Sequence, residues 1–155
     1  MTTITQAASD PELALVRELF REYAADSAID LCFQNFEVEL AGLPGAYSLP
    51  SGRLLLAQCD GQLAACGALR PFAEGVCEMK RLFVRPAFRG RGIGRALAER
   101  LIADARAIGY HAMRLDTLGR MKTAIALYEA LGFRRIDAYR HNPLEDVVYM
   151  ELSLA

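Results

Sequence analysis

The sequence lacks the features that would place it in several large classes of protein. It contains no run of 18 apolar residues, so we expect no membrane-spanning helix. Its N-terminus has neither a basic segment nor an apolar stretch, so we expect no secretory signal and a cytoplasmic location. Its 18 basic and 19 acidic residues give a net charge of -1, which argues against a chain that binds a polyanion along its whole length.

Cysteine and histidine are too few and too scattered to indicate a metal site. The four cysteines are separated by 27, 7 and 11 residues, and these gaps fit no common zinc spacing. The two histidines, His111 and His141, lie far apart in the sequence. We therefore expect no bound metal, and we expect reduced, buried thiols of the kind found in cytosolic proteins.

Length and composition predict one folded domain over residues 1–155. Apolar residues make up 53% of the chain, which is enough for a core, and the low net charge argues against disorder. A second domain would leave neither half with a comfortable core.

The hydrophobic pattern predicts an α/β (α+β) domain with the element order βααβββαβαββ and a mixed sheet. Asp10 is the predicted N-cap of the first helix, with Pro11 in its first turn. The predicted helices cover residues 10–27, 34–41, 93–108 and 122–131. The predicted strands cover residues 2–6, 53–59, 62–70, 76–84, 112–117, 134–138 and 147–153.

The most informative segment is a glycine-rich turn between a predicted strand and a predicted helix, Arg85-Pro-Ala-Phe-Arg-Gly-Arg-Gly-Ile-Gly-Arg95. Gly90, Gly92 and Gly94 allow the backbone to fold tightly and a ligand to approach it. Unpaired N–H groups and the helix dipole then favour an anion at the start of the helix, and phosphate is the natural ligand. Six basic residues and no acidic one lie between Met79 and Ala98, so we expect positive charge to be concentrated at this turn.

Other phosphate-binding motifs fit the turn less well. The dinucleotide fingerprint requires glycine where this chain has Arg95, and the P-loop requires a Gly-Lys-Ser/Thr sequence that is absent. A turn that only starts a helix, with its arginines in solvent, stays open as an alternative. A nucleic-acid patch is disfavoured because only Phe83 and Phe88 are interleaved with the basic residues.

Three motifs resemble the GNAT superfamily of N-acetyltransferases. Arg89-Gly-Arg-Gly-Ile-Gly94 matches that family's R/Q-x-x-G-x-G/A signature, and the preceding Glu78–Val84 looks like its central strand. Ala126–Phe133 resembles its later helix and the strand that follows. The three motifs occur in the family's order and spacing. Two further stretches, 33–43 and 142–151, resemble small members of the family whose substrates are mostly unassigned.

The resemblance implies a GNAT-like, mostly antiparallel mixed sheet and acetyl-CoA as the donor of the acetyl group. In that family the pantetheine arm lies beside the central strand, which maps here to Leu82, Phe83 and Val84. The pyrophosphate lies on the glycine turn, which maps to Arg89, Gly90, Arg91, Gly92, Ile93 and Gly94. Thr117, at the end of the next predicted strand, either contacts the cofactor or caps a turn.

Acetylation of an amine requires a neutral amine, a stabilised oxyanion and a protonated leaving thiolate. Glu78 is the candidate base because it is a carboxylate in an otherwise apolar strand, and alternation places it on the face of Lys80, Leu82 and Val84. An ion pair with Lys80 or a solvated face is the alternative. The resemblance makes Tyr128 the candidate acid, and a place in the buried stripe of its helix is the alternative. A backbone N–H near Leu82 would meet the oxyanion, by analogy with the family.

The acceptor side is predicted to include Phe33, Phe36 and Glu37, because this part of the family's fold varies with substrate and acidic residues would attract a cationic amine. A solvated helix with both phenylalanines in the core is the alternative. Arg70 and the loop 139–142 offer a binding site for a substrate carboxylate instead.

The sequence thus predicts an N-acetyltransferase that moves an acetyl group from acetyl-CoA to a primary amine of a small molecule, directly, in a ternary complex. No Cys-His-Asp arrangement argues for a covalent intermediate. A CoA-binding sensor or protein-interaction module without turnover is the alternative. We expect a small-molecule partner, no nucleic acid and no membrane, and the resemblance allows a homodimer.

Overall fold

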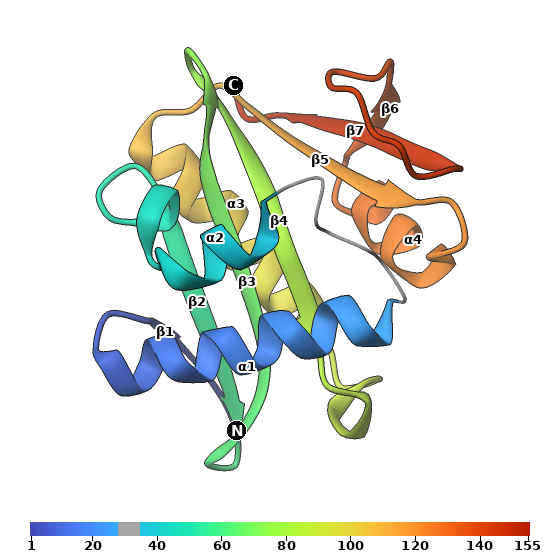
Figure 1. The fold of residues 1–155 in the computed structure, drawn as a ribbon. Helices are drawn as coiled ribbons and strands as arrows, with labels where there is room; N and C mark the ends of the chain where they lie inside the picture. The colour runs from blue at the N-terminus through green and yellow to red at the C-terminus, as the bar shows by residue number, and fades with distance from the viewer. Residues whose placement is uncertain (28–34) are drawn as a thin grey trace.

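A seven-stranded sheet with helices on both faces forms the molecule (Figure 1). The structure is a computed structural model that describes residues 1–27 and 35–155. The strands are β1 (Thr2–Gln6), β2 (Arg53–Cys59), β3 (Gln62–Ala73), β4 (Val76–Val84), β5 (Ala112–Leu118), β6 (Arg134–Ile136) and β7 (Val147–Ser153). The helices are α1 (Asp10–Asp26), α2 (Phe36–Ala41), α3 (Ile93–Ile108) and α4 (Lys122–Ala130), with 3-10 turns at Gly45–Tyr47 and Pro86–Phe88.

The sheet is mixed but mostly antiparallel. Its strand order is β1-β2-β3-β4-β5-β7-β6, and only β4 and β5 are parallel. The α3 crossover makes the parallel pair possible, because a connection between parallel strands must return along the length of the sheet. The predicted fold class and element order are confirmed, with differences of a few residues at the ends of some elements.

Two apolar cores lie on opposite faces of the sheet. One is formed with α1 and α2, and Phe20 and Leu40 are buried there against Leu54 and Leu56 of β2. The other is formed with α3 and α4, whose apolar stripes pack against alternate residues of the same strands. The side chains of β2 point to opposite faces in turn, so one strand contributes to both cores.

The first helix begins with a different cap from the one predicted. Asp10 was the predicted N-cap, but Ser9 occupies that position and Asp10 is the first helical residue. The Oγ atom of Ser9 accepts a 3.3 Å hydrogen bond from the Glu12 N–H, and Oε1 of Glu12 accepts one of 3.0 Å from the Ser9 N–H. This reciprocal pair is a capping box, and it satisfies two N–H groups that Asp10 alone would leave unpaired.

A bulge in β4 overturns the predicted alternation of that strand. Cys66 pairs with Phe83, but Ala68 pairs with Lys80, so two steps along β3 match three along β4. Arg81 takes up the extra residue with a φ of 58°. An inserted residue exchanges the faces of all residues beyond it. Leu82 therefore packs on the α3 and α4 side, rather than on the face it was predicted to share with Lys80 and Glu78.

No helix within residues 1–27 and 35–155 is long and apolar enough to cross a membrane.

Candidate active site

A deep cleft opens where β4 and β5 separate. The two strands pair over only three residues each, from Val76–Glu78 and Ala112–Arg114, although both run on well beyond that point. The ribbon shows β5 diverging from β4 toward α4 (Figure 1). The cleft has a volume of about 620 Å³ and lies between the end of β4, the start of α3 and α4. Beyond residue 78, β5 lies too far from β4 to pair with it. The edge of β4 that faces β5 is therefore not paired with that strand.

The glycine-rich turn forms one end of this cleft, as its sequence predicted. Gly90 and Gly92 have φ angles of 80° and 77°, a backbone conformation that residues with a Cβ rarely adopt. Gly92 is the N-cap of α3 and supplies no capping side chain, so the first N–H groups of α3 are left for a ligand. Gly90, Gly92, Ile93 and Gly94 all line the cleft.

The predicted concentration of positive charge at the turn is only partly correct. Of the six basic residues between 79 and 98, Arg89 and Arg95 line the cleft. Arg85 instead pairs with Glu22 at 2.8 Å on α1, and Arg81 pairs with Glu39 at 3.0 Å. These pairs leave less net positive charge near a bound phosphate than the sequence alone suggests.

Arg89 and Arg91 of the signature occupy different surroundings. Arg89 donates a 3.0 Å hydrogen bond to the Val84 carbonyl and forms a 2.9 Å ion pair with Asp26, so it lies at the rim of the cleft. Arg91 does not line the cleft; its guanidinium lies 5.5 Å from the centre of the Phe88 ring. The Arg91 side chain thus lies outside the cleft, and binding of the cofactor by this residue stays a prediction.

Two further cations at the cleft were missed by the sequence analysis. Arg120 and Lys122 line it from the turn before α4 and from the first residue of that helix. The guanidinium of Arg120 also donates a hydrogen bond to the Ser27 carbonyl, which ties this turn to the end of α1. The sequence does place Arg120 and Lys122 at the start of a predicted helix. Nothing in the sequence shows that this helix start lies opposite the glycine turn.

The residues predicted to lie beside pantetheine all border the cleft. Leu82, Phe83 and Val84 line it, with Phe83 on the α1 side of the sheet and its two neighbours on the other. Thr117 lies instead in a second, smaller cavity, and its Oγ1 donates a 3.5 Å hydrogen bond to the sulfur of Met121. Two roles for Thr117 therefore stay open. It either makes only this local contact with Met121, or it contacts a ligand that occupies the small cavity.

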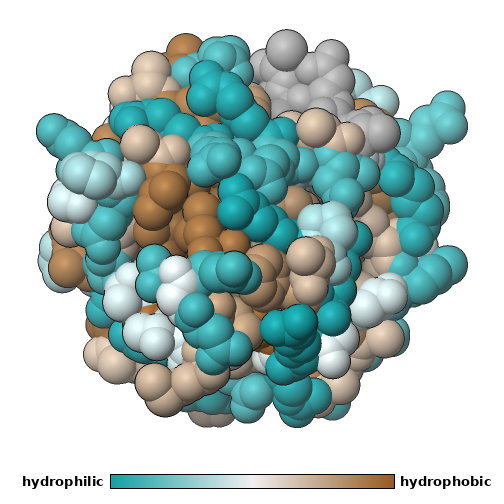
Figure 2. Space-filling view, turned by 90° about the horizontal axis from the view of Figure 1, so that it is seen from below, coloured by the Kyte–Doolittle hydropathy of each residue, from teal (hydrophilic) through white to brown (hydrophobic). Residues whose placement is uncertain are grey.

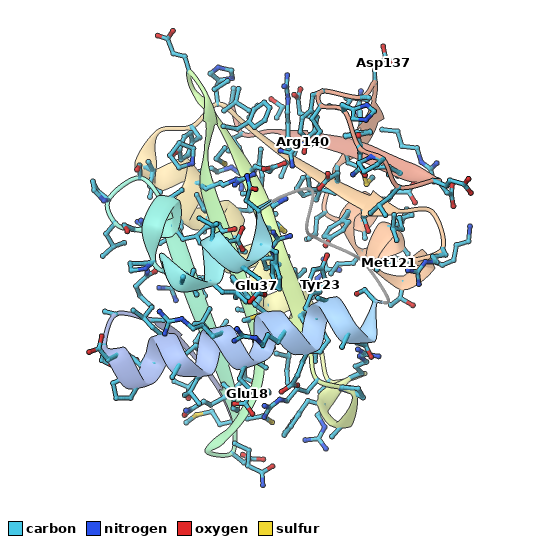
Figure 3. All side chains as sticks on the ribbon, in the orientation of Figure 1. Glu18, Tyr23, Glu37, Met121, Asp137 and Arg140 are labelled. Atoms are coloured by element: carbon cyan, nitrogen blue, oxygen red, sulfur yellow. The ribbon has the colours of Figure 1, made fainter. Side chains whose placement is uncertain are left out.

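The small cavity adjoins the cleft and has a volume of about 70 Å³. The residues that line both spaces are Tyr23, Leu82, Met121, Ala124 and Tyr128. Tyr23 comes from α1 and Met121 from the turn before α4, and both point into the region between these elements (Figure 3). The small cavity also contains polar side chains from three other elements, namely Lys80, Asp116 and Asn142.

Tyr128 lies at the junction of the two spaces. It projects from α4, is 7% exposed, and packs edge-on against Phe133 with the ring centres 5.7 Å apart. Burial raises the pKa of its hydroxyl above the usual value, so the group stays protonated and able to donate. The two interpretations of Tyr128, as a buried residue of its helix and as an acid, do not exclude each other. Its ring is packed against Phe133, and the same residue borders both the cleft and the small cavity.

Glu78 is fully buried and occupied by partners. Its Oε1 accepts hydrogen bonds of 3.1 and 2.9 Å from Nε and Nη2 of Arg70. Its Oε2 accepts a 2.6 Å hydrogen bond from the Tyr139 hydroxyl and another from the Arg140 guanidinium. Burial alone would raise the pKa of this carboxyl, but the charge of Lys80 and the hydrogen bonds from Arg140 and Tyr139 lower it to about 2. The proposed base is thus a strongly held anion.

The two predicted acceptor residues on α2, Phe36 and Glu37, line neither space. Phe36 is buried in the core, with the Arg81 guanidinium 5.3 Å from its ring centre. Glu37 lies between α1 and α2 with a side chain 74% exposed, and it pairs with Arg21 at 3.4 Å (Figure 3). Phe33 lies outside the described residues. Glu39 is the α2 carboxylate that faces inward, in a groove of about 270 Å³ that Arg70 also lines.

Charged and polar side chains cover most of the face of the molecule that is seen from below, and apolar side chains show between them (Figure 2).

Comparisons with known proteins agree with this geometry. Residues 13–133 match the acetyltransferase (GNAT) family. An uncharacterized N-acetyltransferase of Schizosaccharomyces pombe is 41% identical over 139 residues, which cover 88% of this chain and 85% of that protein. A GNAT-family acetyltransferase from Staphylococcus aureus has the same fold, with a TM-score of 0.83 at 18% identity and full coverage of both chains. A proposed acetyltransferase of Salmonella typhimurium, seen with its cofactor acetyl-CoA, has a TM-score of 0.71 at 23% identity, covering 99% of this chain and 94% of its own.

Proposed function

Because this chain belongs to the acetyltransferase (GNAT) family and is an acetyl-CoA-dependent N-acetyltransferase, we propose that its acceptor is a primary amine of a small molecule. The acetyl group passes directly from the thioester to the amine while both are bound. The observation that carries this proposal is the junction at Tyr128, where a long cleft suited to a CoA molecule meets a cavity large enough only for a small polar head.

The cleft fits coenzyme A at both ends. The diphosphate would contact the N–H groups at the start of α3, with Arg89, Arg95, Arg120 and Lys122 around it. The thioester arm would lie along the β4 edge that β5 leaves unpaired beyond residue 78. Charge-assisted hydrogen bonds contribute about 1.5–3 kcal/mol each, and the helix dipole about 0.3–1 kcal/mol, so the arginines and amides account for most of the phosphate affinity.

Tyr128 is the residue proposed to protonate the leaving thiolate. A raised pKa keeps the Tyr128 hydroxyl protonated at neutral pH. Such a phenol is a weaker acid than a thiol with a pKa near 8.5, so its proton passes to the sulfur only as the hydroxyl takes up a proton released by the reacting amine. Burial of the ring against Phe133 fixes the direction of the hydroxyl, which a flexible surface tyrosine would not do.

Cys77 offers no route through an acetylated enzyme. Its thiol is fully buried in the core beneath α3, and burial raises its pKa to about 12. A thiol of this kind is a weak nucleophile at neutral pH. This supports direct transfer in a ternary complex, as the sequence predicted.

The proposal is tested by calorimetry with acetyl-CoA, followed by a screen for CoA release across a panel of amines. The panel contains polyamines, amino acids, aralkylamines and short peptides. Binding together with release on a small primary amine supports the proposal, whereas release only on peptide N-termini contradicts the small-molecule acceptor. Tight binding with no release on any amine would favour a CoA-sensing module.

A further inference from the structure

The small cavity beside Tyr128 has its own carboxylate. Of the described residues that line the cavity, Asp116 on β5 is the only acidic one, and Glu78 is not among them. The Asp116 side chain is only 10% exposed, and its buried Oδ2 accepts no hydrogen bond from the described part of the chain. Buried carboxylate oxygens are rarely left this way, so the structure contains an acceptor atom without a donor at the edge of a cavity.

Glu78 and Asp116 differ in what their oxygens can still accept. A carboxylate has about four lone-pair positions, and the four hydrogen bonds from Arg70, Tyr139 and Arg140 use all of those on Glu78. A proton can therefore reach Glu78 only if one of these donors withdraws. No described donor has to withdraw from Oδ2 of Asp116.

Two cationic side chains lie near Asp116 without saturating its oxygens. Nζ of Lys80 lies 3.9 Å from Oδ1, and Nη1 of Arg140 lies 3.8 Å from Oδ2. Both distances suit an ion pair but exceed a hydrogen bond. Among the described residues, four phenols also interact electrostatically with Asp116, from α1, α4, the loop after β6, and β7: Tyr23, Tyr128, Tyr139 and Tyr149. The guanidinium of Arg81, which pairs with Glu39, belongs to a residue that lines the same cavity.

We propose that Asp116 binds the ammonium group of the acceptor and takes its proton, while Glu78 positions Arg140 and Tyr139 behind it. This inference rests on the proposed function. The ammonium N–H bond breaks as an O–H bond forms on Asp116, and the freed nitrogen lone pair forms the C–N bond. As the C–S bond breaks, the sulfur takes the Tyr128 proton, and the second proton from nitrogen restores that hydroxyl.

The size of the cavity limits the head of the acceptor. A buried water needs roughly 10–15 Å³ measured in this way, so about 70 Å³ holds only about five to seven waters. A primary amine on an unbranched carbon fits such a space, with the rest of the acceptor outside. A secondary amine would place a second substituent against Leu115 and Val147, which line the same cavity.

The test compares Asp116→Asn with Glu151→Gln, using the amine that releases most CoA with the wild-type enzyme. Glu151 is a matched control because it is also a carboxylate in an ion pair. It lies on β7, next to β5, pairs with Arg114 at 2.7 Å, and lines neither the cleft, the small cavity nor the groove at α2. We expect Asp116→Asn to lower kcat/KM about 100-fold or more, with little change in acetyl-CoA affinity. Glu151→Gln should stay within about threefold of wild type.

The pH profile separates a base from a structural residue. The neutral fraction of an alkylamine grows about tenfold per pH unit below its pKa. The deficit of Asp116→Asn should therefore shrink as pH rises, whereas a variant that only disturbs packing keeps a constant deficit. Asp116→Glu, which keeps the charge, should recover part of the rate. If Asp116→Asn does not fold, Asp116→Ser is measured in the same way.

Two results would overturn the inference. One is an Asp116 variant that folds and keeps kcat/KM within about threefold of wild type, together with a Glu78→Gln variant whose deficit is relieved at alkaline pH. The other is an Asp116→Asn deficit that is the same at every pH. A wild-type enzyme that binds acetyl-CoA but acetylates no amine would instead contradict the proposed function.

Discussion

The Tyr139 hydroxyl, in the loop after β6, donates a 2.6 Å hydrogen bond to Oε2 of Glu78 on β4, 61 residues earlier in the chain. This contact connects two parts of the sheet that are not neighbours, since β5 and β7 lie between β4 and β6. Arg140 continues the link, because its guanidinium forms ion pairs with both Glu78 and Asp116. The loop after β6 is thereby held over the small cavity.

Replacing Glu78 with Gln should destabilise the fold and remove part of its acid sensitivity. The pKa of Glu78 is lowered from 4.5 to about 2, so its ionised form stabilises the folded state above pH 4.5. That stabilisation is lost as pH falls from 4.5 through 2, and at 1.36 kcal/mol per pH unit it is about 3 kcal/mol. Urea unfolding at several pH values should show a steeper acid loss for wild type than for Glu78→Gln. Equal slopes would contradict the prediction.

Gly92→Asp should weaken acetyl-CoA binding more than Gly92→Asn. Both side chains impose the same strain at a φ of 77°, and Asn and Asp tolerate this conformation better than other residues. Only Asp adds a negative charge where the diphosphate is proposed to bind, so we expect an additional loss of about tenfold or more in affinity, measured by calorimetry. If the two variants bind equally, the phosphates do not lie at this helix start.

Tyr128→Phe should lower kcat about 100-fold while leaving stability nearly unchanged. The phenyl ring keeps its packing against Phe133, and only the hydroxyl is lost. Tyr110→Phe is a suitable control, since its hydroxyl donates a 2.7 Å hydrogen bond to the Ser51 carbonyl and it does not line the cleft. Steady-state kinetics at saturating acetyl-CoA, together with thermal melts, would measure both. A kcat equal to wild type would remove Tyr128 as the acid.

Arg120→Ala should weaken acetyl-CoA binding about tenfold, whereas Arg91→Ala should change it little. Arg120 lines the cleft opposite the glycine turn, and Arg91 lies over the Phe88 ring outside it. Calorimetry at two salt concentrations would also show a smaller salt dependence for the Arg120 variant, because one fewer cation faces the phosphates. The reverse ranking would show that Arg91 turns inward when the ligand binds.

The sequence predicted the elements and the glycine turn because these depend on short-range patterns. The spacing of apolar residues in α3, the Asp60-Gly61 turn and the glycines at 90 and 92 each carry their own local signal. The residues that form ion pairs with one another carry no such local signal in the sequence. Arg85 is one of the six basic residues that predicted positive charge at the turn, but it forms ion pairs with Glu18 and Glu22, more than 60 residues earlier.

The bulge at Arg81 explains why the site was harder to predict than the fold. Strict alternation placed Glu78 and Leu82 on one face, and no residue type in the strand indicates that Arg81 adopts a positive φ. One extra residue separates Glu78 from the cleft that Leu82 lines. Asp116 was overlooked for a related reason. Its buried Oδ2 accepts no hydrogen bond from the described residues, and this is visible only in three dimensions.

The three-residue ladder between β4 and β5 would make acetyl-CoA, bound along β4 as proposed, a structural part of the protein. The β5, β6 and β7 wing joins the larger sheet through very few main-chain bonds, and a ligand lying along β4 adds bonds at this seam. Saturation with acetyl-CoA should therefore slow amide hydrogen exchange along Leu82–Val84 and across α4, so that occupancy tightens the joint between the two halves of the sheet.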